Sequence, residues 1–290
     1  MTSSATRTVL VPLDGSKIAE NAIPLAGLLG RVFDCDVRFI EVAPDHTPAG
    51  ERGHAAEIFK GYALGRAEHF GIPAKRATAD LLFGDASSVI LSESKRDDSV
   101  ALALATHGRG GFRATLFGSV ADRVIRSAQV PVLVVPGVGG PHTQVEKVLV
   151  TLDGSATAEQ ALAPARAIAA AAHAEMILLR GFSIVPPAAV GYVYYPPEIP
   201  DAIIDEARSY VTGQARPGER ALAVQGEAGA VICSVINDLD VDLVVMSKTG
   251  KRLAARVAMG SITDRVLHTA HRPTLVIPPV GRGGRRGLTV

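Results

Sequence analysis

The segment Val9-Leu-Val-Pro-Leu-Asp-Gly-Ser16 recurs almost unchanged as Val148-Leu-Val-Thr-Leu-Asp-Gly-Ser155. A longer segment that begins Gly118-Ser-Val-Ala-Asp-Arg and ends at Pro136 recurs from Gly260-Ser-Ile-Thr-Asp-Arg to Pro278. The offset between the copies is about 140 residues throughout, far above the period of roughly 20–50 residues that marks solenoid repeats. The chain therefore contains two domain-sized copies of one folding unit.

Within each copy, short apolar runs alternate with amphipathic helical patterns. Apolar strands separated by helices are typical of a parallel sheet covered on both faces, and right-handed crossovers make such a sheet doubly wound. We therefore predict an α/β protein of two Rossmann-like doubly wound domains, each with a five-stranded parallel sheet of order 3-2-1-4-5 and helices on both faces. In the first copy the expected strands are residues 9–13, 37–42, 75–79, 100–105 and 132–135, and the expected helices are 17–31, 55–70, 86–95 and 119–128.

The composition supports two packed domains and excludes several classes of protein. Of 290 residues, 47% are hydrophobic and 20% charged, which excludes a disordered chain. The 30 Lys and Arg residues nearly balance the 29 Asp and Glu residues, so nucleic acid is not expected as a partner. We place the domains at residues 1–138 and 145–280, around the Gly- and Pro-rich stretch 137–142. Residues 281–290 are expected to form a flexible basic tail.

The sequence carries no pattern of a membrane or secreted protein. No apolar run approaches the ~20 residues of a membrane helix, and the first residues contain no apolar signal core. Cys35 and Cys233 have no metal-binding spacing. We therefore expect a cytoplasmic protein with two buried thiols and no membrane partner.

Two loops of each copy should meet where ligands of open α/β sheets bind, at the switch point between strands 1 and 4. In the first copy these loops carry Asp14-Gly-Ser16 and Gly108-x9-Gly118-Ser119. Glycine lets the backbone approach a phosphate closely, and the helix that opens at Ser119 offers free N–H groups to an anion. The pattern favours a phosphate-bearing ligand, but Ser-x-x-Asp after Gly is equally an ordinary helix cap.

Taken together, these residues resemble the universal stress protein family in its tandem two-domain form, over essentially the whole chain. Nucleotide-binding members of that family carry G-x2-G-x9-G-[ST], and here Ala105 and Ser247 stand at the first Gly of the two copies. The resemblance implies ATP or a related adenine nucleotide at each switch point, with a divalent cation such as Mg²⁺ on the phosphates. It also implies a regulatory role in the stress response.

The resemblance assigns ligand-binding positions in both copies. Pro12, Asp14 and Val42 would line the adenosine side of the first site. The phosphates would be held by Gly108, Gly118, Ser119 and Val120. In the second copy Lys248-Thr-Gly-Lys-Arg replaces Thr106-His-Gly-Arg-Gly, which departs further from the family pattern. The remaining expected ligand residues are Ala105 and Arg109 in the first copy, and Thr151, Asp153, Ser247, Gly250, Lys251, Gly260, Ser261 and Ile262 in the second.

Two other functions stay open on the sequence. One is an ATP pyrophosphatase-like enzyme, but the loop Leu13-Asp-Gly-Ser-Lys17 lacks the double Gly of those enzymes. The other is a nucleotide-free interaction module with an unknown protein partner, in which Ala105 and Ser247 have closed the pockets. No motif places a catalytic base, so we expect nucleotide binding rather than catalysis, with at most slow ATP hydrolysis.

The last strand of each copy predicts how the two domains join. Residues 132–135 and 274–277 are apolar and would be exposed sheet edges, which proteins generally cover. Pairing these edges antiparallel about a pseudo-two-fold axis covers both within one chain, and the family resemblance suggests the same arrangement. Association of two chains into a homodimer is left open by the sequence.

Overall fold

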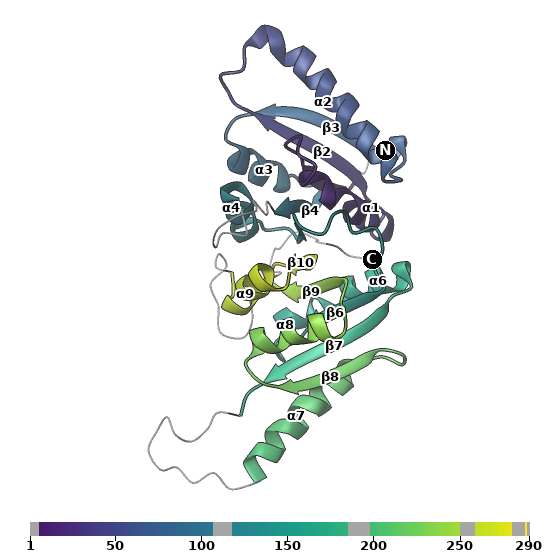
Figure 1. Ribbon diagram of the computed structural model, residues 1–290, viewed down its shortest axis with the longest axis vertical. Helices are drawn as coiled ribbons and strands as arrows, with labels where there is room; N and C mark the ends of the chain where they lie inside the picture. The colour runs from purple at the N-terminus through teal and green to yellow at the C-terminus, as the bar shows by residue number, and fades with distance from the viewer. Residues whose placement is uncertain (1–5, 107–117, 185–197, 250–258, 280–287, 289–290) are drawn as a thin grey trace.

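A computed structural model describes residues 6–106, 118–184, 198–249, 259–279 and 288 of the chain. Within them an α/β fold is confirmed, with helices on both faces of a ten-stranded sheet (Figure 1). None of the described helices has the length and apolar character needed to cross a membrane. Of the tail expected at 281–290, all but Leu288 lies outside the described residues, and the Leu288 side chain is buried in the core.

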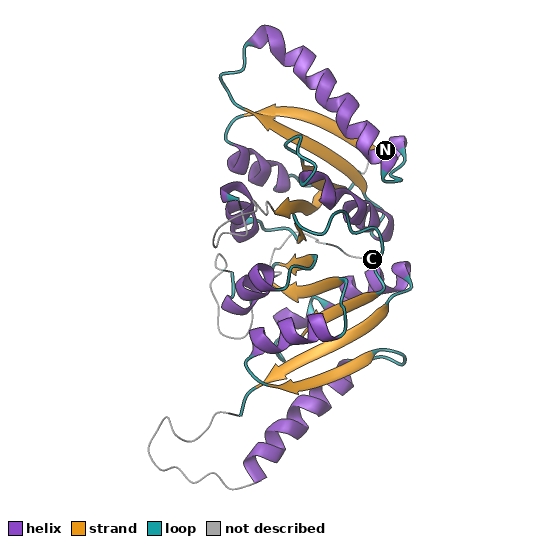
Figure 2. Cartoon of the chain, in the orientation of Figure 1, coloured by secondary structure: helices purple, strands orange, loops and turns teal. Residues whose placement is uncertain are grey.

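Each half of the chain supplies five strands and helices that follow them in alternation (Figure 2). The strands are β1 Thr8–Pro12, β2 Asp36–Ala43, β3 Ala77–Phe83, β4 Ser99–Thr106, β5 Val132–Pro136, β6 Lys147–Thr151, β7 Glu175–Phe182, β8 Arg220–Gln225, β9 Leu243–Ser247 and β10 Thr274–Ile277. The α-helices are α1 Ile23–Val32, α2 Ala49–His69, α3 Ala86–Ser94, α4 Ser119–Ser127, α5 Ala156–Glu159, α6 Leu162–Ala172, α7 Glu198–Gln214, α8 Ala228–Asp238 and α9 Ser261–Thr269. Two 3₁₀ turns, Ala19–Ala22 and Ala74–Arg76, complete the described elements.

The strand order is β3-β2-β1-β4-β5-β10-β9-β6-β7-β8, so each half has the order 3-2-1-4-5 counted along its own strands. Pairing is parallel within each half and antiparallel at the β5–β10 seam between the halves. At the seam, Leu133 lies opposite Leu275 and Val132 opposite Val276. The predicted antiparallel pairing of the two apolar edges is thereby confirmed, and both edges are covered.

The two faces of the sheet differ in how the halves share their cores. Beneath α1, α2, α6 and α7 one continuous cluster of buried side chains runs through both halves, with Leu133 and Leu275 among its members. On the opposite face, α3 and α4 cover one cluster, which Met259, Leu267 and Val276 of the second half join at the seam, and α8 and α9 cover another. Figure 1 shows α3, α4, α9 and α8 following one another along that second face. The two halves therefore share one sheet and one core cluster, rather than forming two separately packed domains.

Three elements of the first half differ by more than one residue from their predicted bounds. The third strand covers Ala77–Phe83 rather than 75–79 because Ala74–Arg76 form a 3₁₀ turn after Pro73. The strand lies at the outer edge of the sheet and is only half-buried, which accommodates Asp80 in mid-strand. The first helix is divided into a 3₁₀ turn and α1 at Ile23, and α2 begins at Ala49, before the expected residue 55.

Candidate functional site

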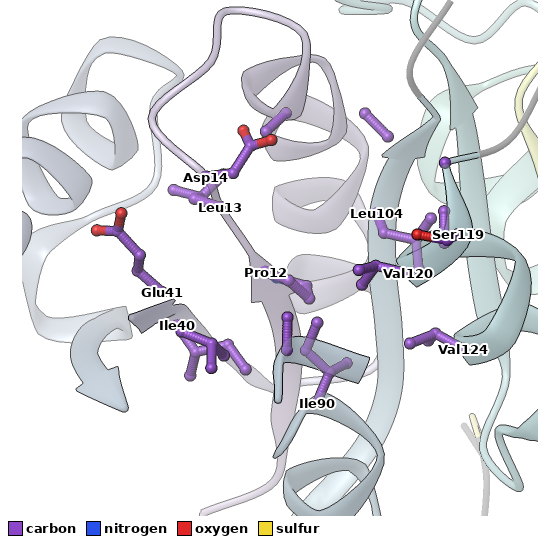
Figure 3. Close-up of a pocket in the computed structure, with 16 residues that line it drawn as sticks. Pro12, Leu13, Asp14, Ile40, Glu41, Ile90, Leu104, Ser119, Val120 and Val124 are labelled. Carbon is purple, nitrogen blue, oxygen red and sulfur yellow. The ribbon is translucent and has the colours of Figure 1, made fainter. Parts of the chain in front are cut away.

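A cavity of about 670 Å³ opens at the carboxyl ends of β1 and β4, at the switch point of the first half. Six elements enclose it: the ends of β1, β2 and β4, the 3₁₀ turn that begins at Ala19, and the N-terminal parts of α3 and α4. Seven residues expected at the first site lie around it together, with apolar neighbours such as Ile40, Ile90 and Leu104 (Figure 3). These seven are Pro12, Asp14, Val42, Ala105, Gly118, Ser119 and Val120.

The loop after β1 is shaped by the carboxylate of Asp14. Its Oδ1 accepts hydrogen bonds from the Ser16 backbone N–H at 3.0 Å and the Ser16 hydroxyl at 2.6 Å. Gly15 between them adopts a φ of +74°, a conformation that glycine takes without steric cost. Ser16 Oγ in turn accepts from the Ala19 N–H at 3.1 Å, so Asp14 both borders the cavity and fixes its rim.

The opposite wall of the cavity is the N-terminal end of α4. Gly118 occupies the cap position with φ −65° and ψ 154°. Because glycine has no side chain, it cannot accept from the N–H groups of the first turn as Asp85 does at α3. No side chain among the described residues caps the first turn of α4, whose N–H groups and positive dipole end can therefore bind an anion beside the cavity.

Sequence reasoning missed Glu41, which also lines the cavity. Its side chain is half-buried at the carboxyl end of β2, between Ile40 and Val42. Burial, and secondly the negative charge of Asp14, raises the pKa of the Glu41 carboxyl above its ordinary value. The cavity therefore has an acidic side at Asp14 and Glu41 and a helix N-terminus at Ser119, which Figure 3 shows across from them. A carboxylate within the apolar end of the strand, Phe39-Ile-Glu-Val-Ala43, was the available sequence signal.

The second half repeats the rim but alters the loop after β9. Asp153 Oδ1 accepts from the Ser155 N–H at 2.9 Å and the Ser155 hydroxyl at 2.6 Å, as Asp14 does with Ser16. Thr263 Oγ1, where the first half has Ala121, donates to the carbonyl of Ser247 at 3.0 Å. This bond fastens the start of the loop to the first turn of α9.

The remaining predicted residues of the second site divide between described and undescribed segments. Thr151 is the last residue of β6 and Ser247 the last residue of β9. Gly260 is the N-cap of α9, and Ser261 is its first residue. The Gly260 N–H donates to the Lys248 carbonyl at 2.9 Å, and the Ile262 side chain is exposed. Gly108, Arg109, Gly250 and Lys251 lie outside the described residues of the two phosphate loops.

The side chain of Lys248, in the loop after β9 of the second half, contacts the first half. Its Nζ donates to the carbonyls of Arg126 at 2.5 Å and Ala128 at 3.1 Å, at the C-terminal end of α4. Arg126 also pairs across the seam with Asp264 of α9 at 2.7 Å. A cation at this end of α4 complements the helix dipole, so the helix that borders the first cavity is held at its far end by the second half.

Replacing Lys248 with Met is expected to flatten the pH dependence of stability between pH 8 and about 10.5. Burial, and secondly the charge of Arg126, lowers the pKa of Lys248 to about 8. In that window the unfolded chain still holds the proton that the folded chain has released, so the folded state gains stability as pH rises. Urea titrations across the window should show the wild type gaining about 2 kcal/mol over the variant. Lys147→Met is the matched control for losing an amine that donates to a backbone carbonyl, here that of Leu239 at 2.7 Å. Parallel pH profiles for the wild type and Lys248→Met would contradict the assignment.

Comparison with known proteins places both halves in one family. The profile of the universal stress protein family matches residues 5–136 and 144–278. A universal stress protein of Mycobacterium tuberculosis is 26% identical over 204 residues, which covers 68% of this chain and 68% of that protein. A universal stress protein of Methanocaldococcus jannaschii is 29% identical over 142 residues, or 44% of this chain and 81% of that protein.

Solved structures share the fold over nearly the whole chain. The crystal structure of a putative universal stress protein from Pseudomonas aeruginosa superposes with a TM-score of 0.72 at 15% identity, covering 95% of this chain and 94% of that one. One from Archaeoglobus fulgidus gives a TM-score of 0.67 at 17% identity, covering 93% and 98%. At these identities the likeness supports the tandem architecture alone.

Proposed function

The chain belongs to the universal stress protein family, and from this premise we propose that its first half binds ATP, or a related adenine nucleotide, as a regulatory ligand of the stress response. The nucleotide would occupy the cavity at the β1/β4 switch point. Its adenosine would lie against Pro12, Asp14 and Val42, and its phosphates at the first turn of α4. Binding would act by favouring one conformation or partner over another.

The observation that carries this proposal is the cavity itself. Its volume of about 670 Å³ lies within the range of roughly 300–1,000 Å³ that small-molecule and cofactor sites occupy. Apolar side chains fit an adenine ring, while the uncapped turn at Gly118, Ser119 and Val120 fits phosphates. Ala105, in place of a family Gly, lines the cavity without filling it.

The proposed role of the nucleotide is binding rather than turnover. Within the described residues, no group of three or more His, Cys, Asp or Glu side chains could hold a metal ion. Mg²⁺ commonly reaches nucleotide sites on the phosphates and retains several waters, so it would enter with ATP.

The proposal also includes partners of the whole chain. Because the β5–β10 seam already joins the two halves within one chain, a homodimer would be formed by two tandem chains. An unidentified protein partner in the cytoplasm would respond to the nucleotide.

A specific observation favours a different role for the second half. Thr263 Oγ1 holds the start of the β9 loop at the Ser247 carbonyl, and Lys248 is committed to α4 of the first half. A nucleotide-free structural partner, rather than a second ATP site, fits these contacts. Whether the second site, with Thr151, Asp153 and Ser261, holds a nucleotide therefore distinguishes a structural partner from a second ATP-binding half.

Acid release of ligand from freshly purified protein tests both statements. We expect about one adenine nucleotide per chain, and a rise in melting temperature on adding ATP to stripped protein, because a ligand that binds only the folded state stabilises it. Two nucleotides per chain would assign a site to the second half as well. No nucleotide and no rise in melting temperature would contradict the proposal and leave the interaction module.

A further inference from the structure

The two halves place opposite charges at one equivalent position beside the switch point. Pro12 of β1 pairs with Ile40 of β2, and its counterpart Thr151 pairs with Leu179. The next residue is Glu41 in the first half and Arg180 in the second.

Arg180 is committed to the packing of the second half. Its Nη2 donates to both carboxylate oxygens of Glu206 on α7, at 2.7 and 3.0 Å. Its guanidinium carbon lies 4.6 Å from the centre of the Tyr210 ring, and only 9% of the residue is exposed. In the second half this position therefore anchors a helix.

Glu41 has no such commitment. It accepts no hydrogen bond and forms no ion pair with any residue that the structure describes, although it is half-buried in the cavity wall. Asp14, the other carboxylate of the wall, has its Oδ1 engaged by Ser16. A carboxylate is an acceptor, so Glu41 can accept hydrogen bonds from donor groups of a ligand in the cavity, and its charge disfavours phosphate on its side.

We propose that Glu41 binds the ribose hydroxyls of the nucleotide in the first half and makes this pocket selective for ribonucleotides. This inference rests on the proposed nucleotide binding. In doubly wound folds that bind dinucleotides, an acidic residue downstream of the first βα turn binds the ribose hydroxyl. Glu41 lies near the end of β2, at the same edge of the sheet as Asp14 and the first turn of α4. With Ser119 and Val120 across the cavity (Figure 3), the ligand is oriented with its sugar toward Glu41.

Binding of ATP, 2′-deoxy-ATP, 3′-deoxy-ATP and inosine triphosphate tests the assignment. The titrations use full-length protein carrying Gly260→Asp, so that the second half does not contribute. We expect the protein with Glu41 intact to prefer ATP over each deoxy analogue at least tenfold, as charge-assisted hydrogen bonds allow. Glu41→Gln should weaken ATP binding about fivefold, leave binding of the deoxy analogues nearly unchanged and so reduce a tenfold preference to about twofold. Glu41→Arg, which introduces the residue type of the second half, should remove the preference entirely.

Each result separates this inference from the proposed function. If ATP does not bind at all, the proposed function fails and the inference falls with it. If ATP binds but Glu41→Gln keeps the preference for ribose, or if the starting protein shows none, Glu41 has no such role although nucleotide binding stands. If Glu41→Gln instead changes only discrimination against inosine triphosphate, Glu41 binds the adenine amino group and the inference is overturned. Without ligand the Glu41→Gln variant should melt at the same temperature as the starting protein or slightly above it, because no described partner is lost and burial disfavours the charge of Glu41.

Discussion

Gly118→Asp should lower the affinity of the first half for ATP by about a hundredfold or more, the scale of losing charge-assisted bonds to phosphate. An aspartate at this cap position accepts from the first-turn N–H groups of α4, which are the groups proposed to hold the phosphates. It also places a negative charge beside the ligand anion. Because aspartate is a favourable cap, the helix should keep its stability. Isothermal titration with ATP measures the loss.

Gly118→Asn is the matched control, since asparagine has the shape of aspartate and caps a helix without a charge. It should bind ATP more weakly than the wild type but at least tenfold better than Gly118→Asp, because only the charge differs. Equal losses in the two variants would mean that the cap side chain excludes the ligand by its bulk or by occupying the N–H groups, rather than by its charge. Unchanged affinity in both would show that the N-terminus of α4 does not hold the phosphates.

Leu133→Ala should lower the free energy of unfolding by about 2–5 kcal/mol, as deletions of buried leucine side chains do. Leu133 is 1% exposed and lies opposite Leu275 at the β5–β10 seam, within the core cluster that both halves share. The cavity left by the deletion would weaken both halves at once, because β5 and β10 belong to one sheet. Urea unfolding followed by circular dichroism measures the change.

Val138→Ala controls for the loss of an apolar side chain near the seam, since 51% of Val138 is exposed; its effect should stay within about 0.5 kcal/mol. Leu275→Ala and the double variant complete a thermodynamic cycle. We expect a coupling of about 0.5–3 kcal/mol between the two leucines, as found for residues in contact. Strict additivity would show that the halves do not support each other at this pair.

The sequence predicted the architecture because repetition and alternation are properties of long segments. Two copies of a strand-helix pattern determine a doubly wound unit, and two apolar end strands determine a covered seam. Bounds were predicted less well where local turns compete with the pattern. Pro73 and the 3₁₀ turn after it displaced β3 toward Phe83, and Pro24 accompanies the restart of the first helix at Ile23.

The sequence predicted the site residues whose positions follow from the backbone of the fold. It did not predict the contacts of long side chains, which depend on tertiary packing. Asp14, Gly118 and Ser119 lie around the cavity because the ends of β1 and β4 meet at the switch point in any such fold. Lys248 was expected in a phosphate loop, yet its four-carbon chain reaches the carbonyls of Arg126 and Ala128 in the other half. No local pattern encodes that choice, because it depends on which groups the seam brings near.

The β5–β10 seam also decides what natural variation can do to this protein. Separate single-domain chains with the same edges would exchange subunits, and every substitution would meet its own copy across the interface. Here both edges belong to one polypeptide, so the halves are always present in equal number and never as two identical copies. Lys248 has no counterpart amine at Thr106, and Glu41 carries the charge opposite to that of Arg180. Tandem fusion thus allows the two halves to carry different residues at equivalent positions and to take different roles, which two identical subunits cannot do.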